Sequence, residues 1–320
     1  MDKVKLGHSD VEITKLCFGA TSLGGMPETY GYDVDEQLAR DTIHAIFDSE
    51  SNVLDTSRNY GFGRSEERIG QVIKERGGLP KNFLISTKLD RSTKNNVFDA
   101  DQARRSLEES LEALSLDSVD ILHLHDPEHA DSIDPILSKG GAIDELFKMK
   151  EEGIAKVVGL AMGPVDLMLS ILKDYDFDVI ITHNRYTILN RNANEVINYA
   201  YQNGISVLNA APFASGILAA GSKAMPRVCY MPADQNNIDS VKELEKLCAQ
   251  NNIDLGAAAL QFSLRDKRIS GTIVGVGCPK HVQDALKWYH DEIPNEFLEI
   301  LNNFSTNMDD PEATRDYKLG

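Results

Sequence analysis

The chain has 320 residues, of which 42% are hydrophobic and 26% charged, values of an ordinary folded protein that exclude a largely disordered chain. It carries 33 basic and 50 acidic residues, and the resulting net charge of −17 argues against nucleic acid or an anionic membrane as a partner. The four cysteines are scattered without a C-x-x-C pair, so neither a zinc site nor a redox dithiol is indicated, and we expect no bound metal.

No part of the sequence resembles a targeting or membrane-spanning segment. The N-terminus MDKVKLGHSDVEI lacks the apolar run of a signal peptide, and no segment approaches the roughly 18 apolar residues of a membrane span. We therefore expect a cytoplasmic protein without a membrane partner. The length suits one domain over residues 1–320, because α/β barrels often run to about 250 residues or more. Residues 305–320 are polar, and we expect this tail to be loosely held.

The predicted elements follow a repeating order along the chain. Residues 3–13 alternate around a turn at 7–10, which predicts a β-hairpin. From residue 15 onward, short apolar runs alternate with segments of helical period, as β/α units do. The predicted strands are residues 15–20, 52–57, 83–89, 118–126, 154–162, 179–184, 205–212 and 271–277. The helices of these units are residues 35–50, 64–76, 99–115, 141–153, 165–175, 193–204, 240–250 and 281–293.

This order predicts an α/β fold whose strands close into a (β/α)8 TIM barrel. Residues 256–268 and 295–304 have helical spacing without a strand of their own, and we expect them to be extra helices outside the barrel. A doubly wound Rossmann sheet shares the alternation and is the alternative. It is less favoured because FGATSLGG, after the first strand, lacks the G-x-G-x-x-G spacing and GVGCPK lacks the third glycine.

Titratable side chains stand at the ends of consecutive predicted strands, where a barrel of this class has its active site. Asp55 ends the second strand, and Tyr60 lies in the loop behind it. Lys88 ends the third strand and His125 the fourth. Reducing a carbonyl needs a proton donor, and a phenol with a pKa near about 10 is a slow one. We expect Lys88 to lower the pKa of Tyr60, Asp55 to orient Lys88, and His125 to hydrogen-bond the substrate oxygen.

Each of these four residues also has a structural interpretation when taken alone, but together they match a known pattern. The segment NVLDTSRNYGFGRSEERIG (52–70) resembles the aldo-keto reductase signature D-T-x-x-x-Y-G followed by S-E-x-x-(I/L)-G. STK (86–88) is similar to the family's strand ending in lysine, and DILHLH (120–125) to its aspartate-to-histidine spacing, which selects His125 over His123. The resemblance implies a barrel that uses NAD(P) to transfer hydride to or from a small carbonyl compound, with Asp55, Tyr60, Lys88 and His125 as its catalytic residues.

The resemblance also implies cofactor-binding positions. They lie at four strand ends, in the loop after the seventh strand and in the helix after the last: Gly19, Ala20, Thr21, Asp55, His183, Pro212, Phe213, Gly216, Leu218, Gly275, Gly277, His281 and Asp284. Three positions depart from the family pattern. Ala161 and Met162 stand where relatives commonly carry Ser-Asn for the carboxamide, and Ala210 stands where many carry an aromatic that stacks on the nicotinamide.

Cofactor preference is expected to depend on the last strand. Many relatives that prefer NADP carry a Lys-Ser pair there and an arginine five residues beyond the serine, whereas this chain has Gly275, Val276 and His281. Without those side chains the charge-assisted hydrogen bonds to a 2′-phosphate are lost. We therefore expect NAD, with NADP as the alternative because of Lys280.

Four further segments, LHLHDPEHA (122–130), HNRYTILNR (183–191), LNAAPFASGILA (208–219) and LQFSLRDKRISGTIVGVG (260–277), resemble the branch with D-threo-aldose 1-dehydrogenases, L-fucose and L-galactose dehydrogenases and pyridoxal 4-dehydrogenase. The branch implies NAD-dependent oxidation of an aldose at C1 to a lactone. The alternatives are a general NADPH-dependent aldehyde or ketone reductase and a non-catalytic nucleotide-binding, redox-sensing subunit. We expect a sugar or aldehyde as the small-molecule substrate, and a monomer or small homo-oligomer.

Overall fold

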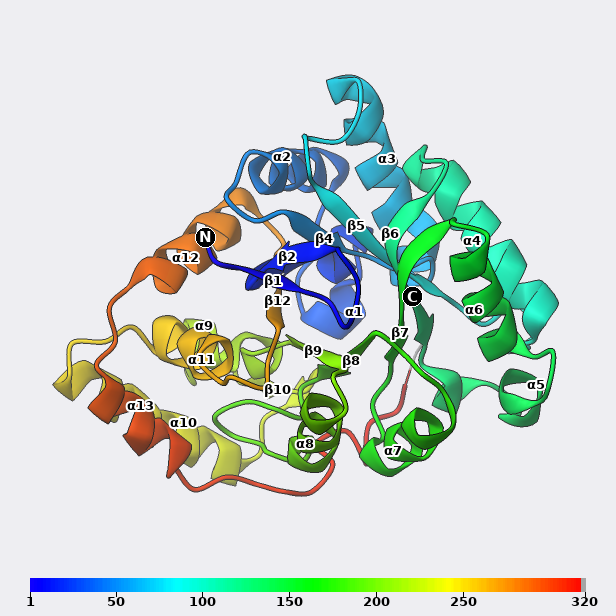
Figure 1. Cartoon of the computed structure of the whole chain (residues 1–320). Helices are drawn as coiled ribbons and strands as arrows, with labels where there is room; N and C mark the ends of the chain where they lie inside the picture. The colour runs from blue at the N-terminus through cyan, green and yellow to red at the C-terminus, as the bar shows by residue number, and fades with distance from the viewer. Residues whose placement is uncertain (318–320) are drawn as a thin grey trace.

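The centre of the molecule is a closed barrel of parallel strands (Figure 1). The computed structural model describes residues 1–317, so the last three residues of the predicted tail, 318–320, lie outside the described residues. Around the barrel the strands are β3 (Leu16–Gly19), β4 (Val53–Asp55), β5 (Leu84–Leu89), β6 (Val119–His125), β7 (Ala155–Ala161), β8 (Val179–His183), β9 (Ser206–Ala210) and β12 (Gly271–Gly275), which pairs back with β3. The (β/α)8 barrel predicted from the sequence is confirmed.

An N-terminal hairpin covers one end of the barrel. Its strands β1 (Lys3–Lys5) and β2 (Glu12–Thr14) are antiparallel. Leu6 and Ile13 are fully buried and pack on the apolar residues inside the barrel. Figure 1 shows this hairpin in front of the strands, so the view is from the N-terminal end of the barrel. The predicted hairpin is therefore present, and the opposite, C-terminal end is the one open to a ligand.

Helices surround the strands. They are α2 (Glu36–Phe47), α3 (Arg64–Arg76), α4 (Ala100–Leu114), α6 (Ala142–Glu151), α7 (Val165–Asp174), α8 (Asn194–Gln202), α10 (Gln235–Gln250), α11 (Leu255–Leu264), α12 (Pro279–His290) and α13 (Asn295–Asn302). Short helices α1 (Pro27–Tyr30), α5 (Asp134–Leu137) and α9 (Ile217–Ala220) and the strand pair β10 (Arg227–Val228) and β11 (Met231–Pro232) lie in the connecting loops. Within residues 1–317 no helix is both long and apolar enough to cross a bilayer.

The two long helices between β9 and β12, α10 and α11, exchange the roles expected from the sequence. The sequence assigns residues 240–250 to the seventh β/α unit and residues 256–268 to an external helix. In the structure α11 is the inner helix, because every residue from Gly256 to Leu264 is buried, whereas α10 buries Val241, Leu244 and Cys248 and exposes its other face. The apolar composition of α11 explains the difference, since a helix that is apolar all round needs protein on every side.

Side chains alternate between the barrel interior and the helices, and this alternation aims the polar residues at the cavity. In β6, Leu122 and Leu124 pack among the helices, while Ile121 belongs to the interior cluster. His123 and His125 share the parity of Ile121 and therefore point inward. His123 lies against β7, where a Cβ at Gly159 would come within 2.3 Å of its Nδ1, so a larger residue at 159 would displace the ring.

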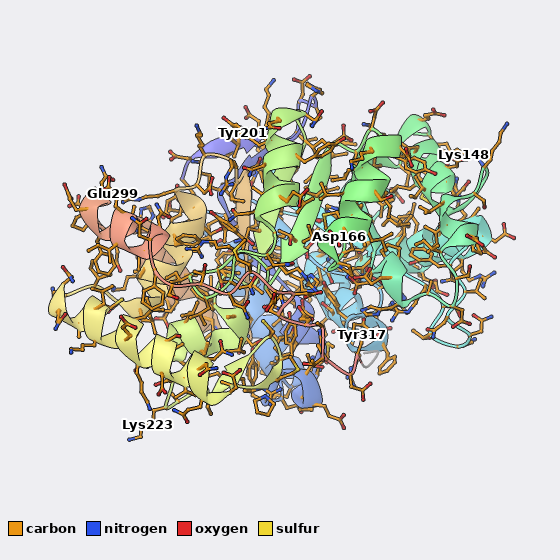
Figure 2. All side chains as sticks on the ribbon, turned by 90° about the horizontal axis from the view of Figure 1, so that it is seen from below. Lys148, Asp166, Tyr201, Lys223, Glu299 and Tyr317 are labelled. Atoms are coloured by element: carbon orange, nitrogen blue, oxygen red, sulfur yellow. The ribbon has the colours of Figure 1, made fainter. Side chains whose placement is uncertain are left out.

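The C-terminal tail lies across the open end of the barrel. After α13 its red trace passes α8 in Figure 1, and Figure 2 places Tyr317 toward the end of the molecule away from Tyr201. The sequence predicts a loosely held tail, whereas the described part is tied to the barrel: Arg191 N donates to Asn307 O at 2.9 Å. Acidic side chains of the tail form ion pairs with a basic side chain in the loop after β8. No local sequence pattern predicts this pairing.

Candidate active site

Neighbouring strands bring three of the four predicted catalytic residues to one end of the barrel. Asp55 is the last residue of β4 and pairs with Ser86 of β5, two positions before Lys88. His125 is the last residue of β6. All three residues are more than nine-tenths buried, and their side chains line one cavity. Because parallel strands end on the same side of the sheet, their C-terminal residues share this end of the barrel.

Lys88 and Asp55 form a buried ion pair. The Lys88 ammonium donates to Asp55 Oδ2 at 2.7 Å and to the backbone carbonyl of Thr56 at 2.6 Å. Ser86 Oγ donates to the other carboxylate oxygen of Asp55 at 2.8 Å. Charges removed from water are stable only when paired and hydrogen-bonded in this way. The pair therefore fixes the ammonium at the floor of the cavity.

The turn after β4 positions Tyr60. Gly61 has φ 61°, and a Cβ there would lie 2.2 Å from Gly24 O, so only glycine allows the turn to approach the first strand's loop so closely. In this position the Lys88 ammonium lies 4.8 Å from the centroid of the Tyr60 ring. The Tyr60 ring meets the His125 ring edge to face, with centroids 5.7 Å apart. The structure thus brings all four predicted catalytic side chains together.

The surroundings of Tyr60 keep its phenol protonated. Burial is the largest influence and, with the Asp55 carboxylate, raises the pKa of Tyr60 well above its ordinary value, while a hydrogen bond with the Thr21 side chain lowers it slightly. The sequence predicts the opposite direction, with Lys88 lowering this pKa. That expectation is wrong for the structure described, because burial and the Asp55 carboxylate dominate the pKa of Tyr60.

His125 is held by a carboxylate that the sequence analysis does not identify. Asp90, directly after β5, has its Oδ1 2.7 Å from His125 Nδ1. Burial alone would lower the pKa of His125, but the carboxylates of Asp126 and Asp90 outweigh it and raise the pKa. The sequence does hold a signal that could have identified Asp90, namely its position. Asp90 follows Lys88 by two residues and comes directly after the same strand, β5. Fully buried His123 makes no hydrogen bond, and burial holds its pKa well below the ordinary value.

The four residues line a cavity of about 540 Å³. It also receives ten of the thirteen predicted cofactor positions: Gly19, Thr21, Asp55, His183, Pro212, Phe213, Gly216, Gly275, His281 and Asp284. Ala20 and Leu218 are instead fully buried in the hydrophobic core, and Gly277 lies against the Tyr32 ring. Of the departures from the family pattern, Ala161 and Ala210 line the cavity, whereas Met162 belongs to the core.

The loop after β9 forms one wall of the cavity. Its backbone is left-handed at Ala211, Ala214 and Ser215, with φ values of 56°, 47° and 68°. Such conformations are strained for these residues and concentrate at functional sites. The loop carries Phe213, whose ring packs on Trp288 with centroids 5.4 Å apart. Trp288 packs against the hydrophobic core and also lines the cavity.

The tail forms a second wall that the sequence analysis missed. Asp310, Glu312, Arg315 and Tyr317 all line the cavity. Glu312 lies 3.1 Å from His183 Nε2 and 3.3 Å from the Arg185 guanidinium, and Arg315 pairs with it at 2.6 Å. The Tyr317 ring stacks on His129, with centroids 3.8 Å apart. His183, predicted to bind the cofactor, is therefore part of an ion-pair network with the tail.

Within residues 1–317, three of the residues that line the cavity have a buried polar atom without a hydrogen-bond partner, and one of them is Arg185. The other two atoms are Asn59 Nδ2, a donor, and Glu128 Oε2, an acceptor. The other oxygen of Glu128 accepts from Gly163 N at 2.8 Å. Burial, followed by the neighbouring Asp126 carboxylate, raises the pKa of Glu128 to about 7. Buried polar groups without partners are costly, so these atoms are suited to a polar ligand.

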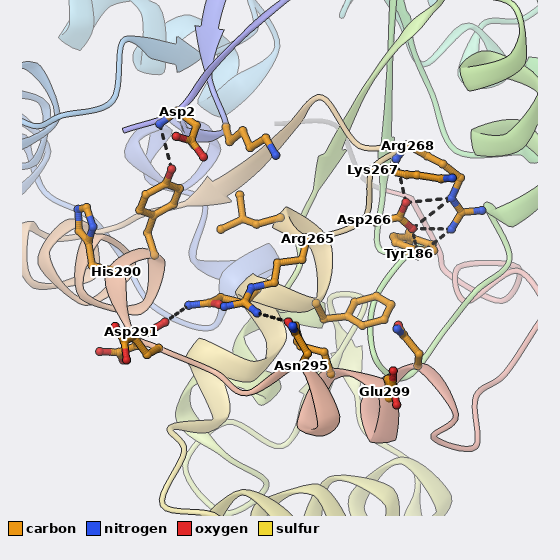
Figure 3. Close-up of a pocket in the computed structure, with 18 of the residues that line it drawn as sticks. Asp2, Tyr186, Arg265, Asp266, Lys267, Arg268, His290, Asp291, Asn295 and Glu299 are labelled. Atoms are coloured by element: carbon orange, nitrogen blue, oxygen red, sulfur yellow. Dashed lines mark hydrogen bonds and ion pairs between the residues drawn. The ribbon is translucent and has the colours of Figure 1, made fainter.

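A larger hollow of about 1150 Å³ lies elsewhere, on the outside of the barrel (Figure 3). It is bordered by the N-terminus and by residues of α11, α12 and α13. Its charged side chains are largely engaged with one another: Arg265 donates to Ile293 O and Asn295, and Arg268 pairs with Asp266. None of the four catalytic candidates lines it. The smaller cavity is therefore the candidate active site.

Comparison with known proteins gives a family match and several relatives. Residues 15–305 match the model of the aldo/keto reductase family. L-galactose dehydrogenase of Arabidopsis thaliana is 31% identical, over 87% of this chain and 85% of the relative. D-threo-aldose 1-dehydrogenase of a Pseudomonas species is 29% identical over 88% and 91%. Pyridoxal 4-dehydrogenase of Microbacterium luteolum is 27% identical over 94% and 97%.

A solved aldo-keto reductase of Bacillus halodurans, in its holo form, has a similar fold. The TM-score is 0.78 at 22% sequence identity, over 99% of this chain and all of that one. At this identity the likeness concerns the fold alone.

Proposed function

The chain belongs to the aldo/keto reductase family and is an NAD(P)-dependent oxidoreductase, and from this premise we propose that it oxidises an aldose at C1 to the lactone with NAD. The observation that carries the proposal is the pair of unpartnered buried atoms beside the catalytic group, Asn59 Nδ2 and Glu128 Oε2. A simple aldehyde, which has no hydroxyl groups, leaves both of these atoms without a hydrogen-bond partner. A sugar offers hydroxyl groups that accept from the first and donate to the second, which favours it by the cost of two unsatisfied groups.

The cavity also fits a dinucleotide. It extends from the catalytic group to Asp284, and the small residues Ala161, Ala210 and Gly275 leave room along its wall, with no atom within 4 Å of a Cβ built at Gly275. We infer that Pro212 and the loop behind it hold the pyrophosphate side. When bound, the nicotinamide exchanges hydride with the substrate carbon, and its oxidised form brings a positive charge that favours a tyrosinate.

The catalytic side chains then divide the work of moving the proton. In the reductive direction the protonated Tyr60 supplies its phenolic proton to the substrate oxygen, and in the oxidative direction its phenolate takes that proton back. The Lys88 ammonium, oriented by Asp55, stabilises the phenolate as it forms. His125 meets the same substrate oxygen and orients it. The residues around them exclude water, which strengthens each of these interactions.

The adenosine end of the cavity supports NAD over NADP. Lys280 is the cation that makes NADP the alternative cofactor in the sequence analysis. Its ammonium donates to both carboxylate oxygens of Asp284 at 2.7 Å. Burial lowers the pKa of His281, so this side chain is neutral near pH 7 and offers no charge to a phosphate. A 2′-phosphate would also meet the Asp284 carboxylate. The charge balance at this end therefore disfavours NADP.

A spectrophotometric screen tests the proposal. Aldoses that differ in single hydroxyl configurations are compared with simple aldehydes and alcohols, each with NAD and with NADP, at mildly alkaline pH. We expect the highest kcat/KM with an aldose and NAD. Faster turnover of simple aldehydes with NADPH would replace the proposal by a general reductase. Cofactor binding without turnover of any substrate would replace it by a redox-sensing subunit.

A further inference from the structure

Asp90 and His125 are neighbours because of the register of their strands. Leu89 pairs with Leu124 between the parallel strands β5 and β6, so the next residue on each strand, Asp90 and His125, come side by side. Asp90 Oδ1 and His125 Nδ1 lie 2.7 Å apart. The side chain of Asp90 is 1% exposed and that of His125 10%. The contact is therefore a hydrogen bond sheltered from water.

The second oxygen of Asp90 is held by two donors from the loop after β4. Ser57 Oγ donates to Asp90 Oδ2 at 2.5 Å, and the backbone N–H of Asn59 donates to it at 3.0 Å. Oδ1 is the oxygen left for the imidazole, and a carboxylate can only accept there. Ser57 Oγ also lies 3.2 Å from His125 Nδ1 and, having given its proton to Asp90, can only accept from the ring. Both neighbours of Nδ1 thus require a proton on that nitrogen.

We propose that Asp90 is a positioning residue for His125, which fixes the ring with its Nδ1–H toward the carboxylate and presents Nε2 to the substrate oxygen. A neutral ring held in this way has a bare Nε2 that accepts a hydrogen bond. The imidazolium has an Nε2–H that donates one. His125 therefore donates to the substrate oxygen, and polarises a carbonyl, only when the ring is charged. The inference rests on the proposed function in one respect, that the substrate oxygen meets Nε2.

The groups that face His125 determine how this switch depends on pH. They are Asp90, Asp126, Lys88, His123, His129 and Tyr60. Burial favours the neutral ring, the two carboxylates favour the imidazolium, and Lys88 opposes them. Asp126 Oδ2 lies 3.6 Å from Nε2, so it acts on the opposite side of the ring from Asp90. Removing either carboxylate should lower the pKa of His125, but only Asp90 controls Nδ1.

Nitrogen NMR of the histidine-labelled enzyme tests the inference directly. In the wild type at alkaline pH, the neutral His125 ring, assigned from its loss in His125→Asn, should carry its proton on Nδ1. This measurement needs no Asp90 variant and no turnover, so it stands even if an aldose is not the substrate or a variant fails to fold. A proton on Nε2 of the neutral ring would overturn the inference.

Two matched variants separate position from charge. In Asp90→Asn, Ser57 and the Asn59 N–H still require an acceptor, so the amide oxygen takes the place of Oδ2 and the amide NH2 faces Nδ1. The neutral ring should then carry its proton on Nε2, and the pKa of His125 should fall by about 1 unit or more. Asp126→Asn should lower the pKa while the proton stays on Nδ1.

Kinetics provide the second readout. With Asp90→Asn the limb of the kcat/KM profile that follows His125 should move to lower pH by the shift seen in NMR, while the Kd for the cofactor is unchanged. Asp101→Asn, an exposed carboxylate on α4, is the control for loss of a charge. An equal loss of kcat/KM at every pH, with the proton still on Nδ1, would show a merely structural role and overturn the inference.

Discussion

Protons at the reactive end of the cavity are controlled by single neighbours. Tyr60 keeps its proton because burial and the Asp55 carboxylate both disfavour a phenolate. The Lys88 ammonium, bonded to Asp55 and Thr56 O at 2.7 and 2.6 Å, does not outweigh these two influences in the resting site. The resting site is therefore poised as a proton donor, and oxidation requires an added positive charge to release the phenolic proton.

Replacement of Tyr60 by phenylalanine removes only the phenolic proton donor. Turnover should fall by about 10²- to 10⁴-fold, the usual contribution of a positioned acid or base. Cofactor affinity should change little, because the hydroxyl acts in the transition state. Steady-state kcat and a fluorescence titration with NADH measure the two quantities. Tyr201→Phe, a 48% exposed tyrosine, is the matched control. Unchanged kcat, or lost cofactor binding, would contradict the assignment.

Asp284 is the residue expected to discriminate against NADP. Asp284→Asn removes a carboxylate and frees Lys280 from its ion pair. The Kd for NADP should fall relative to that for NAD by about tenfold, equivalent to about 1.4 kcal/mol. Lys287→Met is the control variant: it removes another cation of α12 that is paired with carboxylates, those of Asp254 and Asp291. An unchanged ratio of the two Kd values in Asp284→Asn would place the preference elsewhere.

At the scale of elements, loops rather than strands decide how the site is completed. The strands supply Asp55, Lys88 and His125, but the turn after β4 must bring Tyr60 against them. That turn depends on Gly61, because its left-handed φ of 61° and its contact with Gly24 O both exclude a side chain. The tail then covers the cavity through Glu312 and its basic partners.

Gly61→Ala should misplace the Tyr60 ring without unfolding the barrel. The added Cβ would lie 2.2 Å from Gly24 O, so the turn must move. A displacement of about 1 Å can reduce turnover by about 10²-fold. Gly77→Ala is the matched control, since Gly77 has φ 72° but no atom within 4 Å of its added Cβ. Equal kcat values for the two variants would show that the close contact with Gly24 does not determine the position of the Tyr60 ring.

Glu312 should make the stability of the tail depend on pH. Burial alone would raise the pKa of Glu312, but His183, Arg185 and Arg315 lower it well below its ordinary value of 4.5. A depressed pKa contributes stability that is complete above pH 4.5 and is lost as the pH falls toward the folded-state value. The free energy of unfolding of Glu312→Gln should therefore be about 2 kcal/mol lower than that of the wild type at neutral pH.

Urea denaturation of both proteins across the acid range measures this difference. The two unfolding free energies should converge as the pH falls below 4.5, where the Glu312 carboxylate of the unfolded wild-type chain begins to take up its proton while that of the folded chain stays ionised. A difference that stays constant with pH would mean that Glu312 acts through packing rather than charge.

For the whole molecule, the sequence predicts most of the architecture. Each β/α unit buries its own apolar face, so local periodicity indicates the eight strands and the hairpin beneath them. The failures involve contacts between distant segments. Periodicity predicts the two long helices between β9 and β12, α10 and α11. It does not predict which of the two is the inner, fully buried helix. The tail is polar by composition, and its docking depends on Arg185, more than a hundred residues away.

The site shows the same division between local and distant information. Asp55, Tyr60, Lys88 and His125 belong to local motifs, and the structure brings them together. Asp90 has no motif, and its significance appears only through the register of β5 and β6. The partnerless atoms of Asn59 and Glu128 depend on the packing of several loops, which sequence alone does not specify. Candidate catalytic groups on consecutive strands are thus predictable, whereas the groups proposed to select a substrate are much less so.

The central claim is that one barrel end transfers hydride between C1 of an aldose and the nicotinamide. An aldose deuterated at C1 tests it most directly, with NAD as oxidant and proton NMR of the recovered cofactor. The account predicts that the reduced cofactor carries deuterium at C4 of the nicotinamide and that the sugar is recovered as its lactone. Reduced cofactor without deuterium, or no reduced cofactor with any aldose, would contradict it.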